Sequence, residues 1–156
     1  MWITPTLTQC QQRITGAEWS ALSRAALQSG QDGEAMAQDV ITTQVNRIRG
    51  RVGARADNQL GEAGTIPDEL MSAFLALWVS DFITRLPGMK MLLDERRVKA
   101  AEVAESELRH VSEGKIKLVQ PVTAAAPELQ AGGGSTIGLV SKPKRKVTQS
   151  GMSGLI

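Results

Sequence analysis

Aromatic side chains are scarce in this sequence of 156 residues. There are five of them, and none is a tyrosine: Trp2, Trp19, Phe74, Trp78 and Phe82. Sheets are typically rich in aromatic and β-branched residues, so this composition argues against a β-sandwich or β-barrel. Because 42% of the residues are nevertheless hydrophobic, the sequence favours a helical core packed mainly by alanine, leucine and methionine.

Cysteine and histidine occur only once each, as Cys10 and His110. A single cysteine excludes an internal disulfide framework, and a single histidine excludes the usual zinc sites. Cys10 as a nucleophile would need a base beside it, and His110 lies far away in the sequence, so a structural thiol is the favoured interpretation. No nucleotide-binding or calcium-binding motif occurs either. We therefore expect a protein that is not an enzyme and that has no cofactor or metal.

Long hydrophobic runs are also missing. The stretch richest in apolar residues, 70–86, falls short of the ~20 residues that a membrane span needs, and polar side chains interrupt it. The first residues show neither the basic region nor the hydrophobic core of a signal peptide. We expect a protein made in a reducing cytoplasm, with no membrane partner.

Charge is distributed unevenly along the chain, although the net charge is only +2. Residues 1–114 hold twelve basic and fifteen acidic side chains, whereas residues 115–156 hold six basic ones and a single acid, Glu128. The second part also has few large apolar residues, so it cannot bury enough surface to offset its ordering entropy. We predict a compact body over 1–114 and an extended, largely irregular basic arm over 115–156, with room for short strands at 116–119 and 136–140.

Apolar residues at helical spacing predict an all-α body of four to five helices. Thr15 and Glu18 form a capping-box pattern, and Pro67 followed by two acids is typical of a helix start. Gly114 is expected to end the last helix. The predicted helices cover about 8–14, 15–29, 34–52, 67–85 and 89–112. The predicted core includes Trp19, Leu70, Phe74 and Trp78.

The first candidate site is a cluster of arginines at the end of the third predicted helix and in the loop after it. Its members are Arg47, Arg49, Arg51 and Arg55. Arginines in this position can bind the last carbonyl groups of a helix. They could equally contact DNA or the acidic surface of an adjacent subunit. The sequence leaves both interpretations open.

The second candidate site is a peptide in the basic arm. A basic cluster follows a segment in which apolar and small residues alternate. The alternation suits a strand that adds to the edge of another chain's sheet, and the charge would steer the encounter. No aromatic lies in the arm, which excludes base stacking there. We predict a peptide that docks on a protein partner through Ile137, Leu139, Val140, Lys142, Lys144, Arg145 and Lys146.

Five segments, in this order, carry a family resemblance. They are Trp2-Ile-Thr-Pro-Thr-Leu7, Val45-Asn-Arg-Ile-Arg-Gly-Arg-Val52, Gly64-Thr-Ile-Pro-Asp-Glu-Leu70, Thr84-Arg-Leu-Pro-Gly88 and Leu92-Leu-Asp-Glu-Arg-Arg97. Together they resemble the small helical head–tail connector (adaptor) proteins of tailed phages, close to the Mu-like group. The resemblance spans about residues 1–120.

The resemblance implies a structural virion protein of the phage neck, present in the host cytoplasm during assembly. Such a protein forms a homo-oligomeric ring of about twelve copies beneath the portal protein. It also contacts other neck or tail-completion proteins and continues the DNA channel without sequence specificity. An arm too poor in apolar residues to fold alone suits ordering on the portal or on a neighbouring subunit.

Two other functions fit the same sequence. One is a small nucleic-acid-binding or packaging-associated protein that uses the Arg47–Arg55 and Lys142–Lys146 clusters. The other is a scaffold-like or chaperone adaptor whose helices bind another protein without forming a ring. The mass of the assembly, measured with and without portal protein, distinguishes the connector from these two alternatives.

The composition of the arm yields a first testable prediction. Limited proteolysis of the free protein should cut residues 121–156 well before the body, because that segment has too little apolar surface to fold alone. The same sites should be protected in the assembled neck. An arm that resists protease in the free chain would contradict this.

Overall fold

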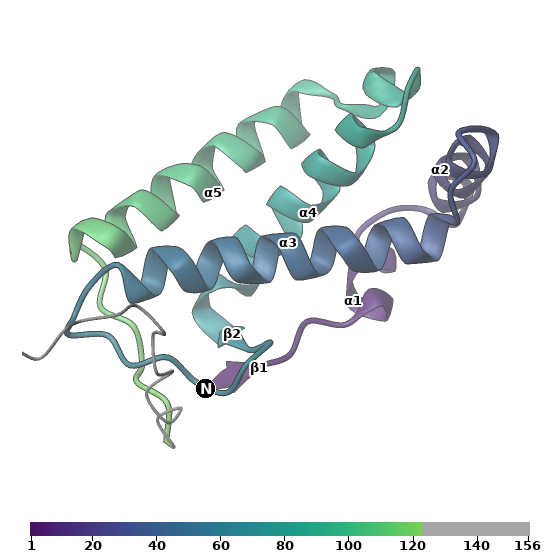
Figure 1. Ribbon diagram of the computed structural model, residues 1–156. Helices are drawn as coiled ribbons and strands as arrows, with labels where there is room; N and C mark the ends of the chain where they lie inside the picture. Colours follow the sequence, from purple (N-terminus) through teal and green to yellow (C-terminus); the bar gives the residue numbers. More distant parts are fainter. Residues whose placement is uncertain (123–156) are drawn as a thin grey trace, which may run out of the picture.

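The computed structural model describes residues 1–122, and within them it confirms the all-α bundle (Figure 1). The predicted docking peptide, residues 137–146, lies outside the described part. The α-helices are α1 (Leu7–Gln11), α2 (Gly16–Gln28), α3 (Gly33–Gly53), α4 (Met71–Arg85) and α5 (Glu95–Glu113). Two 3-10 turns, η1 (Asp68–Leu70) and η2 (Met89–Leu92), and two short strands, β1 (Trp2–Ile3) and β2 (Ile66–Pro67), complete the element order.

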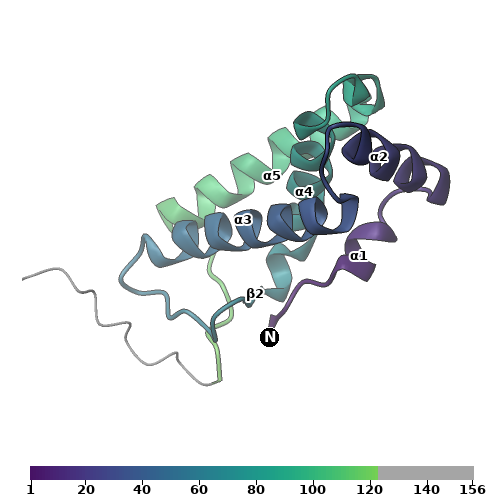
Figure 2. The ribbon, with the colours of Figure 1, turned by 45° about the vertical axis from the view of Figure 1, so that its right-hand side comes forward.

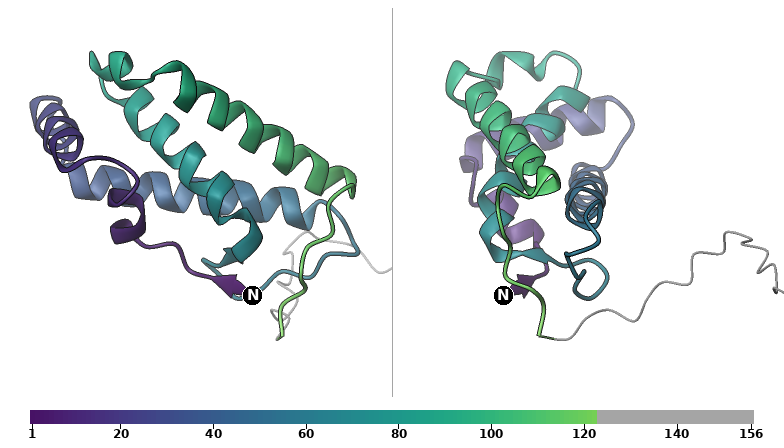
Figure 3. Two further views of the ribbon diagram at one scale, coloured as in Figure 1. Left: turned by 180° about the vertical axis from the view of Figure 1, so that it is seen from behind. Right: turned by 90° about the vertical axis from the view of Figure 1, so that its left-hand side faces the viewer.

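Three long helices build the body. The longest, α3, crosses the molecule, and α4 and α5 pack beside it as a helical hairpin (Figures 1 and 2). Each of these three helices contacts the other two, while α1 and α2 pack at one end of α3. The end-on view in Figure 3 shows the axes of α3 and α5 on different sides of the bundle. Their shared interior is the core.

Polar residues just before the helices explain where four of them begin. In the predicted capping box, the Glu18 amide donates to the Thr15 hydroxyl (3.2 Å) and the Thr15 amide donates to the Glu18 carboxylate (2.8 Å). Thr6 caps α1 in the same way. The carboxylates of Asp32 and Asp94 each accept an amide of the first turn, of α3 and α5 respectively. These caps satisfy amides that have no partner inside the helix.

The predicted helix start at Pro67 is wrong by a few residues. Ile66 and Pro67 are extended and pair antiparallel with β1, in the register Trp2 opposite Pro67 and Ile3 opposite Ile66. The Asp68 amide then donates to the Met1 carbonyl (2.8 Å), which continues the pairing. The chain enters α4 only after the turn η1, because the pairing holds Pro67 in an extended conformation (ψ 135°).

The last predicted helix, 89–112, is interrupted. Residues 89–92 form the 3-10 turn η2, and α5 begins only at Glu95. Asp94 causes the break, because it is extended (ψ 165°) and its carboxylate accepts the Arg97 amide (2.8 Å) as an N-cap. The C-terminal end is as predicted, since Gly114 adopts the left-handed conformation (φ +76°) that ends α5.

The segment after α5 crosses the end of the body, toward β1 and the loop after α3 (Figure 1). The short strand expected at 116–119 does not form. Instead, Leu118 is buried and Ile116 packs against the core, so apolar burial holds these residues. The predicted boundary at 114 therefore marks the end of the helices, while packing continues to about residue 120.

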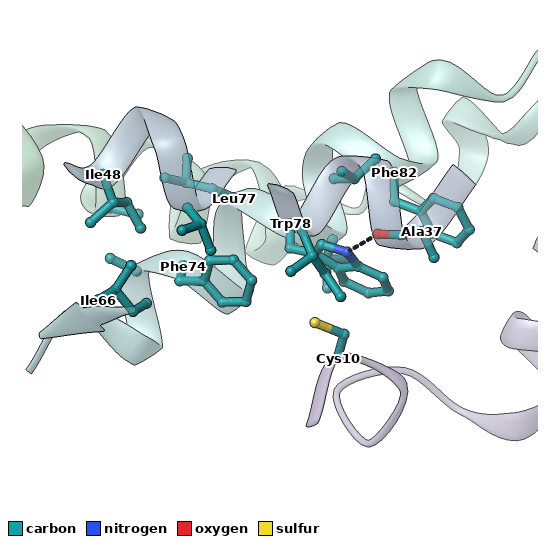
Figure 4. Packing of buried hydrophobic residues seen from close by; sticks show 14 of the residues in the cluster. Cys10, Ala37, Ile48, Ile66, Phe74, Leu77, Trp78 and Phe82 are labelled. Atoms are coloured by element: carbon teal, nitrogen blue, oxygen red, sulfur yellow. Dashed lines mark hydrogen bonds between the residues drawn. The ribbon is translucent and has the colours of Figure 1, made fainter. Parts of the chain in front are cut away.

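Aromatic residues occupy the middle of the core (Figure 4). Leu70, Phe74 and Trp78 are fully buried, as predicted, and the Trp78 indole N–H donates to the Ala37 carbonyl across to α3 (3.2 Å). Phe82 stacks on Trp78 (5.1 Å between ring centroids) and on Trp19 (5.8 Å). Trp19 itself is only half-buried, because it covers the outer side of Phe82.

Cys10 lies beneath the aromatic core, with its sulfur directed toward Trp78 (Figure 4). It is fully buried, and this burial raises the pKa of the thiol to about 12. The thiol is therefore protonated at neutral pH and shielded from reagents. Its surroundings are those of a packing residue.

An ion pair joins the first turn of α2 to the first turn of α5. Arg97 Nη2 lies 2.8 Å from Glu18 Oε1, and both side chains are largely covered. The pKa of Glu18 is lowered, first by the hydrogen bond from the Thr15 amide and further by Arg97. Because folding lowers the pKa of Glu18, its ionised carboxylate stabilises the folded protein at pH values above the unfolded-state pKa. This stabilisation is lost as the pH falls through the folded-state pKa.

Substituting Glu18→Gln should lower the free energy of unfolding by roughly 1 kcal/mol at neutral pH, because the amide keeps the capping geometry but loses the charge. Urea titrations at neutral and acidic pH measure this difference, which should vanish in acid. Glu34→Gln, at an exposed acid in the first turn of α3, is the matched control. A difference of equal size at both pH values would refute the ion pair's contribution.

Candidate assembly site

Two members of the predicted arginine cluster point away from the core on α3. Arg47 is partly exposed, and its Nη2 lies 2.5 Å from Glu105 Oε1 of α5. Arg51 is exposed and forms no ion pair with any residue from 1 to 122. Arg51 is therefore the cationic group of the cluster best placed to meet another molecule.

Arg55 connects the end of α3 to the end of α5. Its guanidinium donates to the Asp57 carboxylate (2.7 Å) and to the Glu113 carbonyl (3.2 Å). The second bond satisfies a carbonyl at a helix end, as the intramolecular interpretation of the cluster expects, although the helix is α5 and not α3. Arg55 also covers Gly114, where an added Cβ would collide with the guanidinium.

Arg49 organises the loop that follows α3. Its guanidinium donates to the carbonyls of Gly61 (3.2 Å), Glu62 (2.8 Å) and Thr65 (2.9 Å). It also lies 6.0 Å from the ring centroid of Trp2. Only the planar fork of an arginine can donate to three carbonyls in this way and still stack near an aromatic ring.

Trp2 connects the beginning of the chain to its last described residues. Its indole N–H donates to the Val119 carbonyl (3.2 Å), and its ring packs so closely on Gly61 that an added Cβ would lie 2.7 Å away. Figure 1 shows β1 and the segment after α5 at the same end of the molecule. Glycine at position 61 thus lets the loop lie against the indole ring.

Two further bonds fix the course of the chain after α5. The Val119 amide donates to the Glu69 carboxylate (3.1 Å), and the Gln59 amide donates to the Gln120 side chain (2.7 Å). We call the set Trp2, Arg49, Glu69, Val119 and Gln120 the arm root. It defines the point on the body from which the predicted arm departs.

The surface around the arm root is hollowed and partly apolar. A depression of about 420 Å³ lies between the N-terminus, the loop after α3 and the departing chain. Three apolar side chains at its rim are largely exposed: Met1 (76%), Val119 (57%) and Val122. Apolar side chains that the body leaves uncovered in one place are a common feature of contact surfaces.

The structure separates the predicted sites into three groups. Arg47 and Arg51 face outward, Arg49 and Arg55 bind backbone carbonyls of the chain itself, and residues 137–146 lie outside the described part. Sequence reasoning missed the arm root. Its members come from distant parts of the sequence, and the one local signal was an aromatic residue, Trp2, that lies before the first predicted helix.

Neither a cluster of metal ligands nor a membrane-spanning helix is found in the part of the chain that the structure describes. Among residues 1–122, no three side chains of the types that bind metals gather together. No helix in that range combines the length and hydrophobicity needed to cross a bilayer. The chain matches no family model, no curated protein and no solved structure.

The close contact between Gly61 and Trp2 can be tested by substitution. Gly61→Ala should destabilise the protein by roughly 1–3 kcal/mol, because the new methyl group would overlap the indole ring. Gly50→Ala is the matched control: Gly50 lies within α3 with no atom near its added Cβ, so this change should stabilise by about 0.5–1 kcal/mol. Thermal or urea unfolding measures both, and equal effects would contradict the packing of Trp2 on Gly61.

Proposed function

We propose that this chain is a structural subunit of a tailed-phage neck, a head–tail connector (adaptor) that forms a ring beneath the portal. The observation that carries the proposal is the arm root. A compact helical body holds the chain at one fixed point where it leaves the last helix. The sequence of residues 123–156 contains four basic residues, all within the cluster Lys142–Lys146, and one acid, Glu128.

In this proposal the arm connects the subunit to the portal or to a neighbouring subunit. Ile137, Leu139 and Val140 would add a strand to the partner's sheet, and the basic cluster would steer the approach. The arm root sets where each arm begins, so identical copies in a ring would present their arms at equivalent positions. The exposed apolar rim around the root offers a second contact for the same partner.

The outward-facing arginines supply the proposed contact with DNA or with the adjacent subunit. Arg51 supplies a positive charge, unpaired within residues 1–122, that suits a channel wall which DNA passes without sequence recognition, and Arg47, partly exposed and paired with Glu105, lies one turn away on α3. Arg49 and Arg55 would act indirectly, by shaping the loop beside them. Other neck or tail-completion proteins would bind the far side of the ring, and no enzymatic step is involved.

The alternative is a small nucleic-acid-binding or packaging-associated protein. The exposed Arg51 together with the basic cluster at Lys142–Lys146 favours it. Binding through phosphates would weaken steeply as salt rises, whereas a connector would join the portal at moderate salt without needing DNA. Loss of DNA binding on removal of the arm would assign any such binding to the arm and not to Arg51.

The docking role of the arm predicts the behaviour of a truncation. Deleting residues 135–156 should abolish stable attachment of heads to necks, because the proposed peptide is lost. The body should keep its helical circular dichroism and its unfolding midpoint, since its packing ends near residue 120.

A second variant separates charge from strand addition in the same assay. Replacing Lys142, Lys144, Arg145 and Lys146 by glutamine should slow the attachment of heads to necks and make its rate insensitive to salt. The attached state should be as stable as with the parent chain. Normal attachment by the truncated chain would overturn the docking role.

A further inference from the structure

A groove runs between α4 and α5 on the side of this hairpin opposite α3. The core side of α4 meets α3 through Trp78 and Ala37, and α5 meets α3 through Glu105 and Arg47. The other side holds a depression of about 440 Å³. Its floor consists of small side chains, which allow close approach of another helix: Ala73, Ala76, Ala100 and Ala104.

An exposed apolar side chain stands beside this floor. Val103 of α5 lines the groove and is 60% exposed. A β-branched residue costs little side-chain entropy when it packs, so it makes a suitable knob for a hole of the size that the alanines leave. The same face therefore carries both a projection and a recess.

The charges of the groove are separated along its length. Arg13, Arg96 and Lys99 lie toward the beginning of α5, and none of them forms an ion pair within residues 1–122. Glu107 lies toward the other end and is also unpaired within that range. No acidic side chain of the described residues other than Glu107 lines the groove. The groove is thus basic at one end and acidic at the other.

This pattern is symmetric about the middle of α5. Arg96, Ala100, Val103 and Glu107 are spaced four, three and four residues apart, so they share one face of the helix. The midpoint of the set falls between Ala100 and Val103. A second α5 laid antiparallel across it would bring Arg96 opposite Glu107 of the partner subunit, and Val103 opposite Ala100 of the partner subunit.

We propose that a second copy of this chain docks in the groove, through a two-fold contact in which the two α5 helices pack antiparallel. The contact is self-complementary in shape and in charge, as a two-fold interface requires. A nucleic acid is a poorer occupant, because Glu107 would repel its phosphates.

The pairing goes beyond the proposed ring. A two-fold contact is complete with two copies, whereas a ring needs a contact that repeats around an axis. The proposed dimer is a state of the free subunit. A monomeric free subunit would therefore leave the proposed attachment of the neck untouched, and a failure of attachment would leave the proposed dimer untouched.

Charge reversal tests the pairing. Sedimentation equilibrium of the full chain at moderate salt should show a reversible dimer. Arg96→Glu alone and Glu107→Arg alone should each raise its dissociation constant at least about tenfold, because each places like charges together. The double variant should recover most of the loss, since the pair is re-formed with its charges exchanged.

Two matched controls lie on the opposite side of the same helix. Arg109→Glu and Glu102→Arg change the same charges at exposed positions outside the groove, and should leave the dissociation constant within about twofold of the parent. Circular dichroism establishes that every variant is folded.

Three results would overturn the proposal. They are a parent chain that is monomeric throughout the concentration range, a dimer that the single reversals leave unchanged, and single losses that the double variant does not recover. A monomer that instead binds an acidic protein through Arg96 would assign the groove to that partner.

Discussion

The guanidinium of Arg49 makes the contacts on which the end of the molecule with the arm root depends. The loop between α3 and β2 has no regular backbone pairing, so its carbonyls need other donors. Arg49 supplies three of them and places the loop against Trp2. Trp2 in turn donates to the Val119 carbonyl, so Arg49 contributes through Trp2 to the course of the chain after α5.

The rest of the body keeps that end in place. The three long helices share one aromatic core, in which the Trp78 indole N–H reaches the backbone of α3 and the rings of Trp19 and Phe82 stack outward from it. Strand β2 joins this core to the N-terminus, since Ile66 is buried while its backbone pairs with Ile3. The core and the arm root are therefore two ends of one continuous packing arrangement.

Local signals predicted the helices well. The Thr15 capping box, the apolar spacing of α3 and the glycine stop at Gly114 all depend on residues within a turn or two of one another. The start of α4 was misplaced because pairing with β1 keeps Pro67 extended, and that pairing involves residues more than sixty positions away. The ion pair between Glu18 and Arg97 could not be predicted for the same reason, since the two residues lie far apart in the sequence.

In the candidate sites, too, local sequence predicted the residue types but not the long-range contacts. The sequence identified four arginines, but it could not distinguish Arg51, which faces outward, from Arg49, which binds three carbonyls of the loop. That distinction depends on where the loop folds back. The groove between α4 and α5 could not be predicted because Arg13 lies more than eighty positions from the cations of α5, and only the packing of the helices brings them together.

Assembly is the central claim, and the mass of the complex formed with portal protein tests it most directly. Native mass spectrometry of the full chain, alone and mixed with the portal at moderate salt, gives the number of copies bound. The account predicts a closed, portal-bound oligomer of many copies. A chain that keeps its own mass in the presence of the portal, and binds DNA instead, would contradict it.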